Sequence, residues 1–318
     1  MGIMVQGKWR IEDFAERNRK GSYIRASTSF RNWIGGDDFP AVAGRYHLVV
    51  AHACPWAHRT LIFRALKGLE NVISVAFVEP LMLENGWVLA DGGDPVTGAK
   101  YAHQIYAQAA PDYSGRCSVP ILWDKIANTI VSNESSEIIR MLNSAFDDLA
   151  TKSVPDLYPD DLRAEIDAVN EVVYENINNG VYRTGFATTQ DAYEASYISL
   201  FEALDSMEAR LVTHRYLTGP RITEADWRLF ATLVRFDAVY VGHFKCNRQR
   251  IADFPNLSNY LRELYQWPGI APTVDIPRIK EHYYGSHRAI NPFGVVPSGP
   301  DLDFVAPHDR RRLSGAED

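Results

Sequence analysis

The chain has few cysteines, no long apolar run and no excess of positive charge. Its 318 residues include three cysteines, an odd and sparse set that is typical of a reducing compartment and argues against a disulfide framework. No run of about 18 apolar residues occurs, and the N-terminal residues lack the pattern of a signal or transit peptide. The formal charge is −7 and the basic residues are scattered. We therefore expect a cytoplasmic protein without a membrane or nucleic-acid partner.

The length and composition favour two folded domains. At 318 residues the chain is long enough for two ordinary domains, each with its own core. Hydrophobic residues make up 46% and charged residues 23%, as in soluble globular proteins. We predict an N-terminal extension with a thioredoxin-like α/β domain at 1–155, and an all-α domain with a C-terminal tail at 156–318.

The N-terminal half alternates strands and helices. Residues 1–44 show no sustained periodicity and are expected to form an extension on the fold. In chain order we then predict a strand at 46–51, a helix at 56–66, a strand at 72–78, a loop at 84–100, strands at 120–124 and 129–131, and a helix that begins at 132–135. The order β-α-β, loop, β-β-α is that of the thioredoxin fold.

The C-terminal half carries helical periodicity instead. Amphipathic runs occur at 162–177, 193–211, 224–240 and 257–265. Thr223-Glu224-Ala225-Asp226 is a capping box that marks one helix start, and Ile222 before it can pack on Trp227 as a staple. The tail after Pro292 is rich in Pro, Gly and Asp, and it includes Arg310-Arg311-Arg312. We expect this tail to be partly disordered.

Cys54 lies where the first predicted strand gives way to the first predicted helix. Pro55 follows it, as is common in the first turn of a helix. The unpaired N–H groups and the dipole of a helix start favour a thiolate, which makes Cys54 a candidate nucleophile. A dithiol motif would need a second cysteine at position 57, where Ala57 stands. An external thiol must therefore resolve any mixed disulfide, unless Cys54 is a buried structural residue.

Two further segments offer groups that fit a peptide ligand. Val119-Pro120 precedes a predicted strand, and a cis bond there would expose the backbone of Val119 to an extended peptide such as glutathione. Glu134-Ser135 at a helix start offers a carboxylate to an ammonium group, and a hydroxyl with backbone N–H groups to a carboxylate. The alternatives are an ordinary trans proline in a turn and simple helix capping.

Five segments together narrow the choice of protein family. In chain order they are Cys54-Pro55-Trp56-Ala57-His58-Arg59, Ser132-Asn133-Glu134-Ser135-Ser136, the run from Thr223 to Phe230, the run from Arg235 to Asn247, and His282-Tyr283-Tyr284-Gly285-Ser286-His287. They resemble the glutathione transferase superfamily and, within it, the Xi class, the glutathionyl-hydroquinone reductases. A proline-flanked cysteine also occurs in omega-class and other cysteine transferases, whereas the run from Arg235 to Asn247 is a far more specific resemblance to the Xi class.

The resemblance implies a glutathione transferase fold, glutathione as co-substrate, a homodimer and a set of site residues. It implies that Cys54 is the nucleophile, that Trp87, Val119, Glu134 and Ser135 hold glutathione, and that Tyr193, Tyr240 and Tyr283 line an aromatic pocket. Phenols suit a quinol because they stack on its ring and hydrogen-bond its oxygens. The alternative for each tyrosine is a half-buried packing role, and Tyr284 competes with Tyr283.

The implied activity is glutathione-dependent reduction of glutathionyl-hydroquinones through a disulfide between Cys54 and glutathione. One alternative is an omega-like thioltransferase or dehydroascorbate reductase, and another is a non-catalytic binding module. His282 and His287 lack companions at metal-ligand spacing, and no Gly-rich phosphate loop follows a strand. We expect neither a metal nor a nucleotide cofactor.

Overall fold

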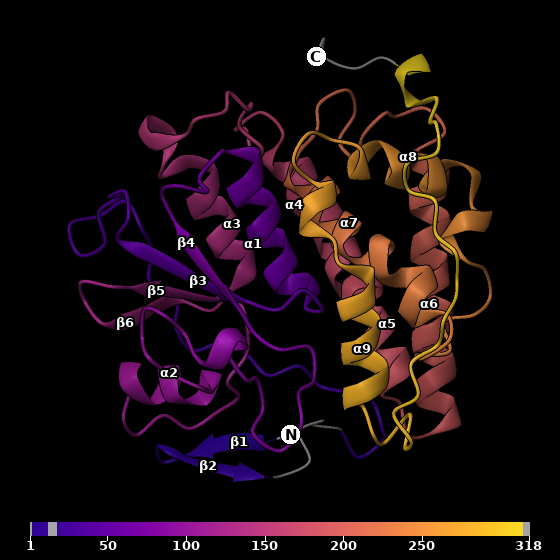
Figure 1. Ribbon diagram of the computed structural model, residues 1–318. Coiled ribbons are helices and arrows are strands. Elements are labelled where there is room, and N and C mark those ends of the chain that lie inside the picture. The colour runs from indigo at the N-terminus through magenta and orange to yellow at the C-terminus, as the bar shows by residue number, and fades with distance from the viewer. Residues whose placement is uncertain (1, 12–17, 314–318) are drawn as a thin grey trace. The chain divides into compact units, whose positions relative to one another are not determined.

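The computed structural model describes residues 2–11 and 18–313, which form two compact units (Figure 1). Unit 1 comprises Met1–Glu16, Arg25–Val154 and Pro277–Arg288, and unit 2 comprises Arg17–Ile24, Pro155–Ile276 and Ala289–Asp318. Each unit therefore draws on segments that are distant in the sequence. The predicted domains, 1–155 and 156–318, are continuous, and that division stays a prediction.

Unit 1 contains a four-stranded mixed sheet of order β4-β3-β5-β6. The strands are β3 (Tyr46–Val50), β4 (Ser74–Phe77), β5 (Ile121–Asp124) and β6 (Thr129–Ser132). β4 runs parallel to β3, whereas β5 is antiparallel to both β3 and β6. β3 is buried along its whole length, which explains its nearly continuous apolar sequence.

Three helices cover this sheet. Helices α1 (Pro55–Leu66) and α3 (Ser135–Ser144) pack against each other, and α2 (Ala102–Ala109) lies on the other side of the sheet (Figure 1). The predicted order of β3, α1, β4, β5, β6 and α3 is confirmed, and with it the thioredoxin-like fold.

Before β5, unit 1 contains a hairpin and a helix that were not predicted. One is the hairpin of β1 (Gly2–Val5) and β2 (Lys8–Ile11), joined by Gln6 and Gly7 with φ values of 47° and 72°. Positive φ at both turn positions suits the twist of a tight hairpin. The other is α2, which buries Ala102, Ile105 and Tyr106 on one face. Each is short, so its periodicity covers too few residues to stand out from the loops beside it.

The elements of unit 2 in the described residues are helices. They are α4 (Arg163–Val172), α5 (Gly180–Gly185), α6 (Gln190–Arg210), α7 (Glu224–Arg235) and α8 (Pro255–Tyr265). α4 and α7 continue into π-helical turns at Val173–Asn178 and Phe236–Tyr240, so the predicted runs 162–177 and 224–240 are confirmed as helical. The capping box is also confirmed, because the Thr223 N–H donates to Asp226 Oδ2 at 2.8 Å.

Helix α9 (Ile276–Ser286) was also not predicted and belongs largely to unit 1, and α5 likewise lies outside the predicted helical runs. Short 3₁₀ segments complete the secondary structure at Ala90–Gly92, Asp147–Leu149, Ile251–Asp253, Ala271–Thr273 and Arg310–Arg312. None of the helices within 2–11 and 18–313 has the length and apolar character needed to cross a bilayer.

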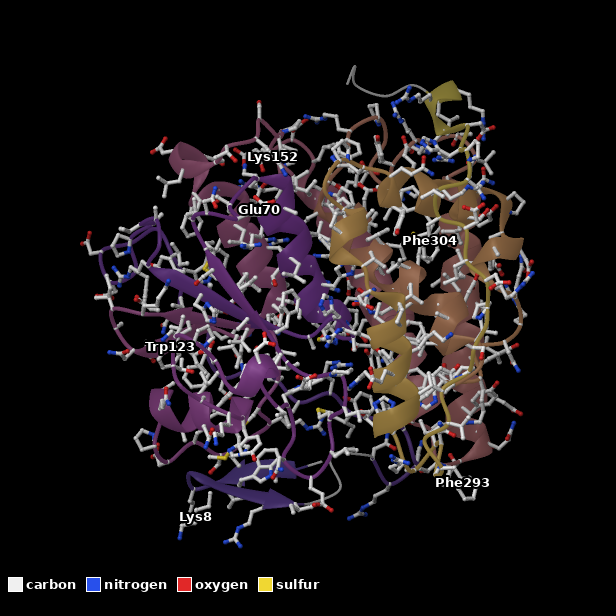
Figure 2. The ribbon with its side chains drawn as sticks, in the orientation of Figure 1. Lys8, Glu70, Trp123, Lys152, Phe293 and Phe304 are labelled. Atoms are coloured by element: carbon white, nitrogen blue, oxygen red, sulfur yellow. The ribbon has the colours of Figure 1, made fainter. Side chains whose placement is uncertain are left out.

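The expectation of a partly disordered tail is wrong for residues 292–313. Gln266 Nε2 donates to the carbonyls of Phe304 and Ala306 at 2.9 and 2.8 Å, and the Phe304 ring lies 4.9 Å from that of Tyr265. Phe293 is 90% exposed, whereas Phe304 rests on α8 (Figure 2). Side-chain contacts, which composition does not reveal, hold this Pro- and Gly-rich segment. Residues 314–318, which the prediction also covered, lie outside the described residues.

Candidate active site

Cys54 is the N-cap residue of α1. Its backbone is extended, with φ −77° and ψ 115°, and its sulfur accepts a hydrogen bond from the Ala57 N–H at 3.4 Å. The same sulfur donates to the Val119 carbonyl at 3.3 Å. The side chain is half-buried. A sulfur in this position is close to the positive end of the helix and to the start of β5.

The Val119-Pro120 bond is cis, which decides between the two alternatives that the sequence left open. It immediately precedes β5, whose residue Ile121 pairs with Val49 near the end of β3. At the other side of β5, Leu122 pairs with Ser132, the last residue of β6. The antiparallel pairing therefore places the end of β3, the start of β5 and the end of β6 next to one another, at the same end of the sheet. Cys54 follows β3, Val119 precedes β5 and Glu134 follows β6.

Glu134 is the N-cap residue of α3. Its Oε1 accepts hydrogen bonds from the Ser136 N–H and hydroxyl at 3.1 and 2.8 Å, and its Oε2 accepts one from the Thr28 hydroxyl at 3.0 Å. Burial acts to raise the pKa of Glu134, but these hydrogen bonds and the charge of Arg59 on α1 outweigh it, so the pKa is lowered overall. The carboxylate is therefore ionised at neutral pH. Ser135 beside it is buried.

Trp87 lies in the segment between β4 and α2 and is 8% exposed. Its carbonyl accepts from the Ala102 N–H at 3.0 Å, and its ring stacks on His282 of α9 with centroids 4.9 Å apart. His282 Nδ1 in turn lies 2.8 Å from the Pro80 carbonyl oxygen. One contact thus holds the backbone of Trp87 and the other holds its indole.

The three predicted pocket tyrosines come from both units. Tyr283 belongs to unit 1, is 1% exposed and lies edge-on to His282 and His287. Tyr240, in unit 2, is fully buried and its ring stacks on Phe244 with centroids 5.5 Å apart. The competing Tyr284 is half-buried.

Tyr193 differs from the other two because it is half-buried and lies on α6. Its hydroxyl donates to the Lys245 carbonyl at 2.9 Å, next to the Phe244 ring on which Tyr240 stacks. Burial raises the pKa of Tyr193, so the phenol stays protonated at neutral pH. Tyr193 and Tyr240 are therefore both anchored to the segment that follows α7.

Among the residues that the structure describes, no group of three or more His, Cys, Asp and Glu side chains is arranged to hold a metal ion. The groups at this end of the sheet are the Cys54 thiol, the Val119 carbonyl at an X-Pro bond, the Glu134 carboxylate and the N–H groups of two helix starts. Such groups suit an anionic thiol and a zwitterionic peptide.

Comparisons with known proteins identify the family of the chain. The family model for the glutathione S-transferase N-terminal domain matches residues 53–145, and the model for the C-terminal domain matches residues 190–263. Glutathionyl-hydroquinone reductase YqjG of Escherichia coli is 50% identical over 98% of both chains. Glutathionyl-hydroquinone reductase PcpF of Sphingobium chlorophenolicum is 52% identical over 94% of this chain and 96% of its own.

The chain is also similar to solved structures of glutathione transferases. The glutathione-bound structure of YqjG superposes with a TM-score of 0.90, covering 98% of this chain and 99% of YqjG at 49% identity. The Xi-class transferase of Natrialba magadii superposes with a TM-score of 0.92, also at 49% identity, and covers 99% and 98% of the two chains. The chain belongs to the Xi class of glutathione transferases. The resemblance and the fold class expected from the sequence are confirmed.

Some contacts in this Xi-class chain had no sequence signal. His282 was weighed only as a metal ligand, whereas it stacks on Trp87. Thr28 lies in a segment without a motif, yet its hydroxyl reaches Glu134. Both contacts join residues more than 100 positions apart, so no local pattern could reveal them.

The environments of the three thiols predict a selective reaction with iodoacetamide at neutral pH. Burial raises the pKa of Cys117 and of Cys246, so both stay protonated and react slowly. Cys54 is half-buried at a helix start and is expected to be alkylated first. Peptide mapping by mass spectrometry over time measures the order. In urea the three rates should converge, and faster labelling of Cys117 in the folded protein would contradict the assignment.

Proposed function

We propose that this Xi-class protein reduces glutathionyl-hydroquinones to hydroquinones, with glutathione as reductant and Cys54 as nucleophile. The observation that carries the proposal is the position of Cys54, at the N-cap of α1 and 3.3 Å from the carbonyl of Val119, whose bond to Pro120 is cis. The names of YqjG and PcpF, each about half identical to the chain, support this choice of reaction.

The glutathione half of the substrate is proposed to bind at the end of the sheet in unit 1 where β5 begins. The backbone of Val119 pairs with the cysteinyl part, as a strand edge pairs with an extended peptide. The ionised Glu134 accepts from the ammonium of the γ-glutamyl end, and the Ser135 hydroxyl with the α3 N–H groups receives its carboxylate. Trp87, held by His282, provides an aromatic wall. The bound glutathione of YqjG supports a glutathione site in this fold.

The ring of the hydroquinone is proposed to meet Tyr193, Tyr240 and Tyr283. Their rings offer stacking surface, and a protonated phenol donates a hydrogen bond to a quinol oxygen. The Tyr193 hydroxyl donates its proton to the Lys245 carbonyl, so towards the ligand it offers its lone pairs as acceptors for a quinol hydroxyl.

The proposed reaction has two steps. The Cys54 thiolate attacks the thioether sulfur, the carbon–sulfur bond breaks, and the aryl carbon takes the electron pair and a proton to give the hydroquinone. A pocket tyrosine is our candidate for the proton donor. Cys54 is then joined to glutathione by a disulfide. A second glutathione thiolate attacks this disulfide, releasing glutathione disulfide and restoring Cys54.

Product stoichiometry tests the proposal. The purified protein with a synthetic glutathionyl-hydroquinone and excess glutathione is expected to give one hydroquinone per glutathione disulfide, because the two steps release one of each. Both products are measured by liquid chromatography. Dehydroascorbate and a small mixed disulfide serve as competing substrates. Activity on these two without any hydroquinone would retain Cys54 as nucleophile but favour the omega-like alternative, and inactivity on all three would favour a binding module.

Two further properties belong to this proposal. A cytoplasmic location fits a mechanism that needs reduced glutathione. It also fits the three free cysteines, which all lie in the described residues. A homodimer is also proposed, on the basis of the family alone. Sedimentation of the purified protein measures its oligomeric state.

A further inference from the structure

Residues 25–32 belong to the part of the chain before β3 that was expected to be an extension without an assigned role. This segment lies against β6, the strand that leads to Glu134. The Asn32 N–H donates to the Val131 carbonyl at 2.9 Å, and the Asn133 N–H donates to the Phe30 carbonyl at 3.2 Å. The Asn133 side chain returns the contact, accepting from the Phe30 N–H at 3.2 Å. This pairing fixes the segment beside the residue that precedes Glu134.

The same segment also contacts α1 next to Cys54. The Arg25 guanidinium lies 4.6 Å from the centroid of the Trp56 ring, and that of Arg59 lies at the same distance from it. Trp56 is two residues beyond Cys54 in the first turn of α1. Each cation–π contact attracts the guanidinium to the face of the indole ring. The segment is therefore held at both helix starts that carry the proposed glutathione contacts.

Thr28 lies in the sequence between Arg25 and Phe30, and it contacts the proposed glutathione site itself. Its hydroxyl donates to Glu134 Oε2 at 3.0 Å, while Ser136 occupies Oε1 with two hydrogen bonds. Each carboxylate oxygen accepts about two hydrogen bonds. Among the described residues, this arrangement leaves an acceptor position on Oε2, the oxygen that Thr28 orients.

We propose that Thr28 is a positioning residue for the γ-glutamyl ammonium of glutathione, acting through Glu134. The proposal rests on the proposed function only in that Glu134 contacts this ammonium. The Thr28 hydroxyl fixes the rotation of the carboxylate, so that the remaining acceptor position of Oε2 points to one place. Without the hydroxyl, Glu134 keeps its charge and its cap on α3 but loses this orientation.

The test measures binding instead of turnover. Calorimetry with reduced protein gives the Kd for glutathione and for the analogue in which a glutaryl group replaces γ-glutamyl and thus removes the ammonium. Thr28→Val removes the hydroxyl at nearly constant volume, and Thr28→Ser restores it. Thr151→Val is the matched control, because Thr151 donates its hydroxyl to the Gly68 carbonyl at the other end of α1.

We expect Thr28→Val to raise the Kd for glutathione by about 3- to 10-fold, the net effect of one ordinary hydrogen bond, because Glu134 keeps its charge and loses only its orientation. Its Kd for the glutaryl analogue should equal that of the wild type. Thr28→Ser and Thr151→Val should bind both ligands as the wild type does. An unchanged Kd for glutathione in Thr28→Val overturns the inference, as does an equal loss for both ligands. If the wild type binds no glutathione, the proposed function itself fails.

Discussion

Replacing Cys54 by alanine is expected to abolish the reduction of glutathionyl-hydroquinones, with a loss of at least about 10³-fold in kcat/KM. The reason is that no second sulfur can take over. Ala57 occupies the place of a dithiol partner, and burial raises the pKa of both Cys117 and Cys246. Hydroquinone release, followed by chromatography under excess glutathione, measures the loss.

Cys117→Ala is the matched control, because Cys117 is a half-buried thiol of the same unit. It should retain the wild-type rate. Intact-mass spectrometry after incubation with substrate, in the absence of free glutathione, should detect one glutathione adduct on the wild type and on Cys117→Ala. Cys54→Ala should carry none. Residual turnover in Cys54→Ala at the wild-type rate would rule out the proposed covalent step and require direct attack by glutathione.

The parts of this site that the sequence predicted are those with a local signal. Cys54-Pro55 joins a buried strand to a helix start, and Val119-Pro120 precedes a strand, so each signal lies within a few residues of its effect. The capping box at Thr223 is of the same kind. Burial along β3 likewise follows from five consecutive residues. Local patterns of this type determine element order and therefore predicted the thioredoxin-like fold.

What the sequence did not reveal depends on contacts between distant segments. Thr28 and Glu134, and Trp87 and His282, meet only because the chain folds. Glu134 and His282 lie in segments that resemble the family, but neither segment indicates its distant partner. The assignment of α9 to unit 1 is a further example, since it follows from packing near Pro80 and Trp87 and not from its own sequence. These contacts position the residues that the local signals supply.

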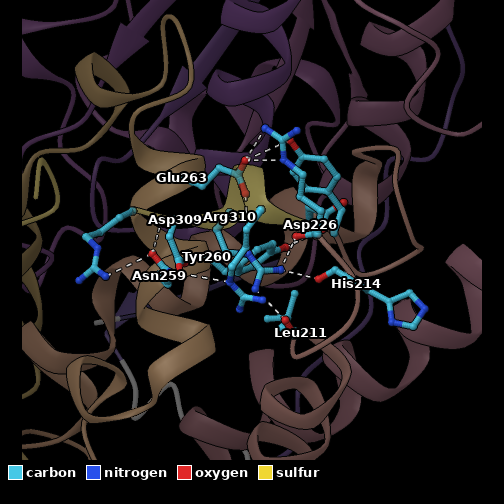
Figure 3. A network of polar contacts seen from close by, with 12 residues as sticks. Leu211, His214, Asp226, Asn259, Tyr260, Glu263, Asp309 and Arg310 are labelled. Atoms are coloured by element: carbon cyan, nitrogen blue, oxygen red, sulfur yellow. Dashed lines mark hydrogen bonds and ion pairs between the residues drawn. The ribbon is translucent and has the colours of Figure 1, made fainter. Parts of the chain in front are cut away.

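The three consecutive arginines of the C-terminal tail are another case in which the sequence did not reveal a long-range contact. Here the contact has a large expected effect on the free energy of unfolding. Composition predicted disorder here, yet Arg310 is fully buried, whereas Arg311 and Arg312 are exposed. The Arg310 guanidinium donates to the carbonyls of Leu211 and Arg215, both at 2.7 Å, and to that of His214 (Figure 3).

These carbonyls lie at and just beyond the C-terminal end of α6, where the last helical turn leaves carbonyl groups without backbone partners. A buried cation at this end satisfies them and complements the helix dipole. Arg310 also forms an ion pair with Glu263 of α8 at 3.9 Å. One side chain thus ties the tail to the ends of two helices of unit 2.

Arg310→Ala is therefore expected to lower the free energy of unfolding by about 3–5 kcal/mol, the usual cost of removing one partner from a buried charged network. The variant would leave buried carbonyls without a donor and Glu263 with Arg215 as its remaining ion-pair partner. Arg311→Ala is the matched control and should change the free energy by less than about 0.5 kcal/mol. Urea denaturation of both variants, followed by tryptophan fluorescence, measures the difference. Equal stabilities for the two variants would mean that the tail does not hold unit 2 together, whereas a selective loss in Arg310→Ala would establish that this Pro- and Gly-rich tail is a structural part of the helical unit.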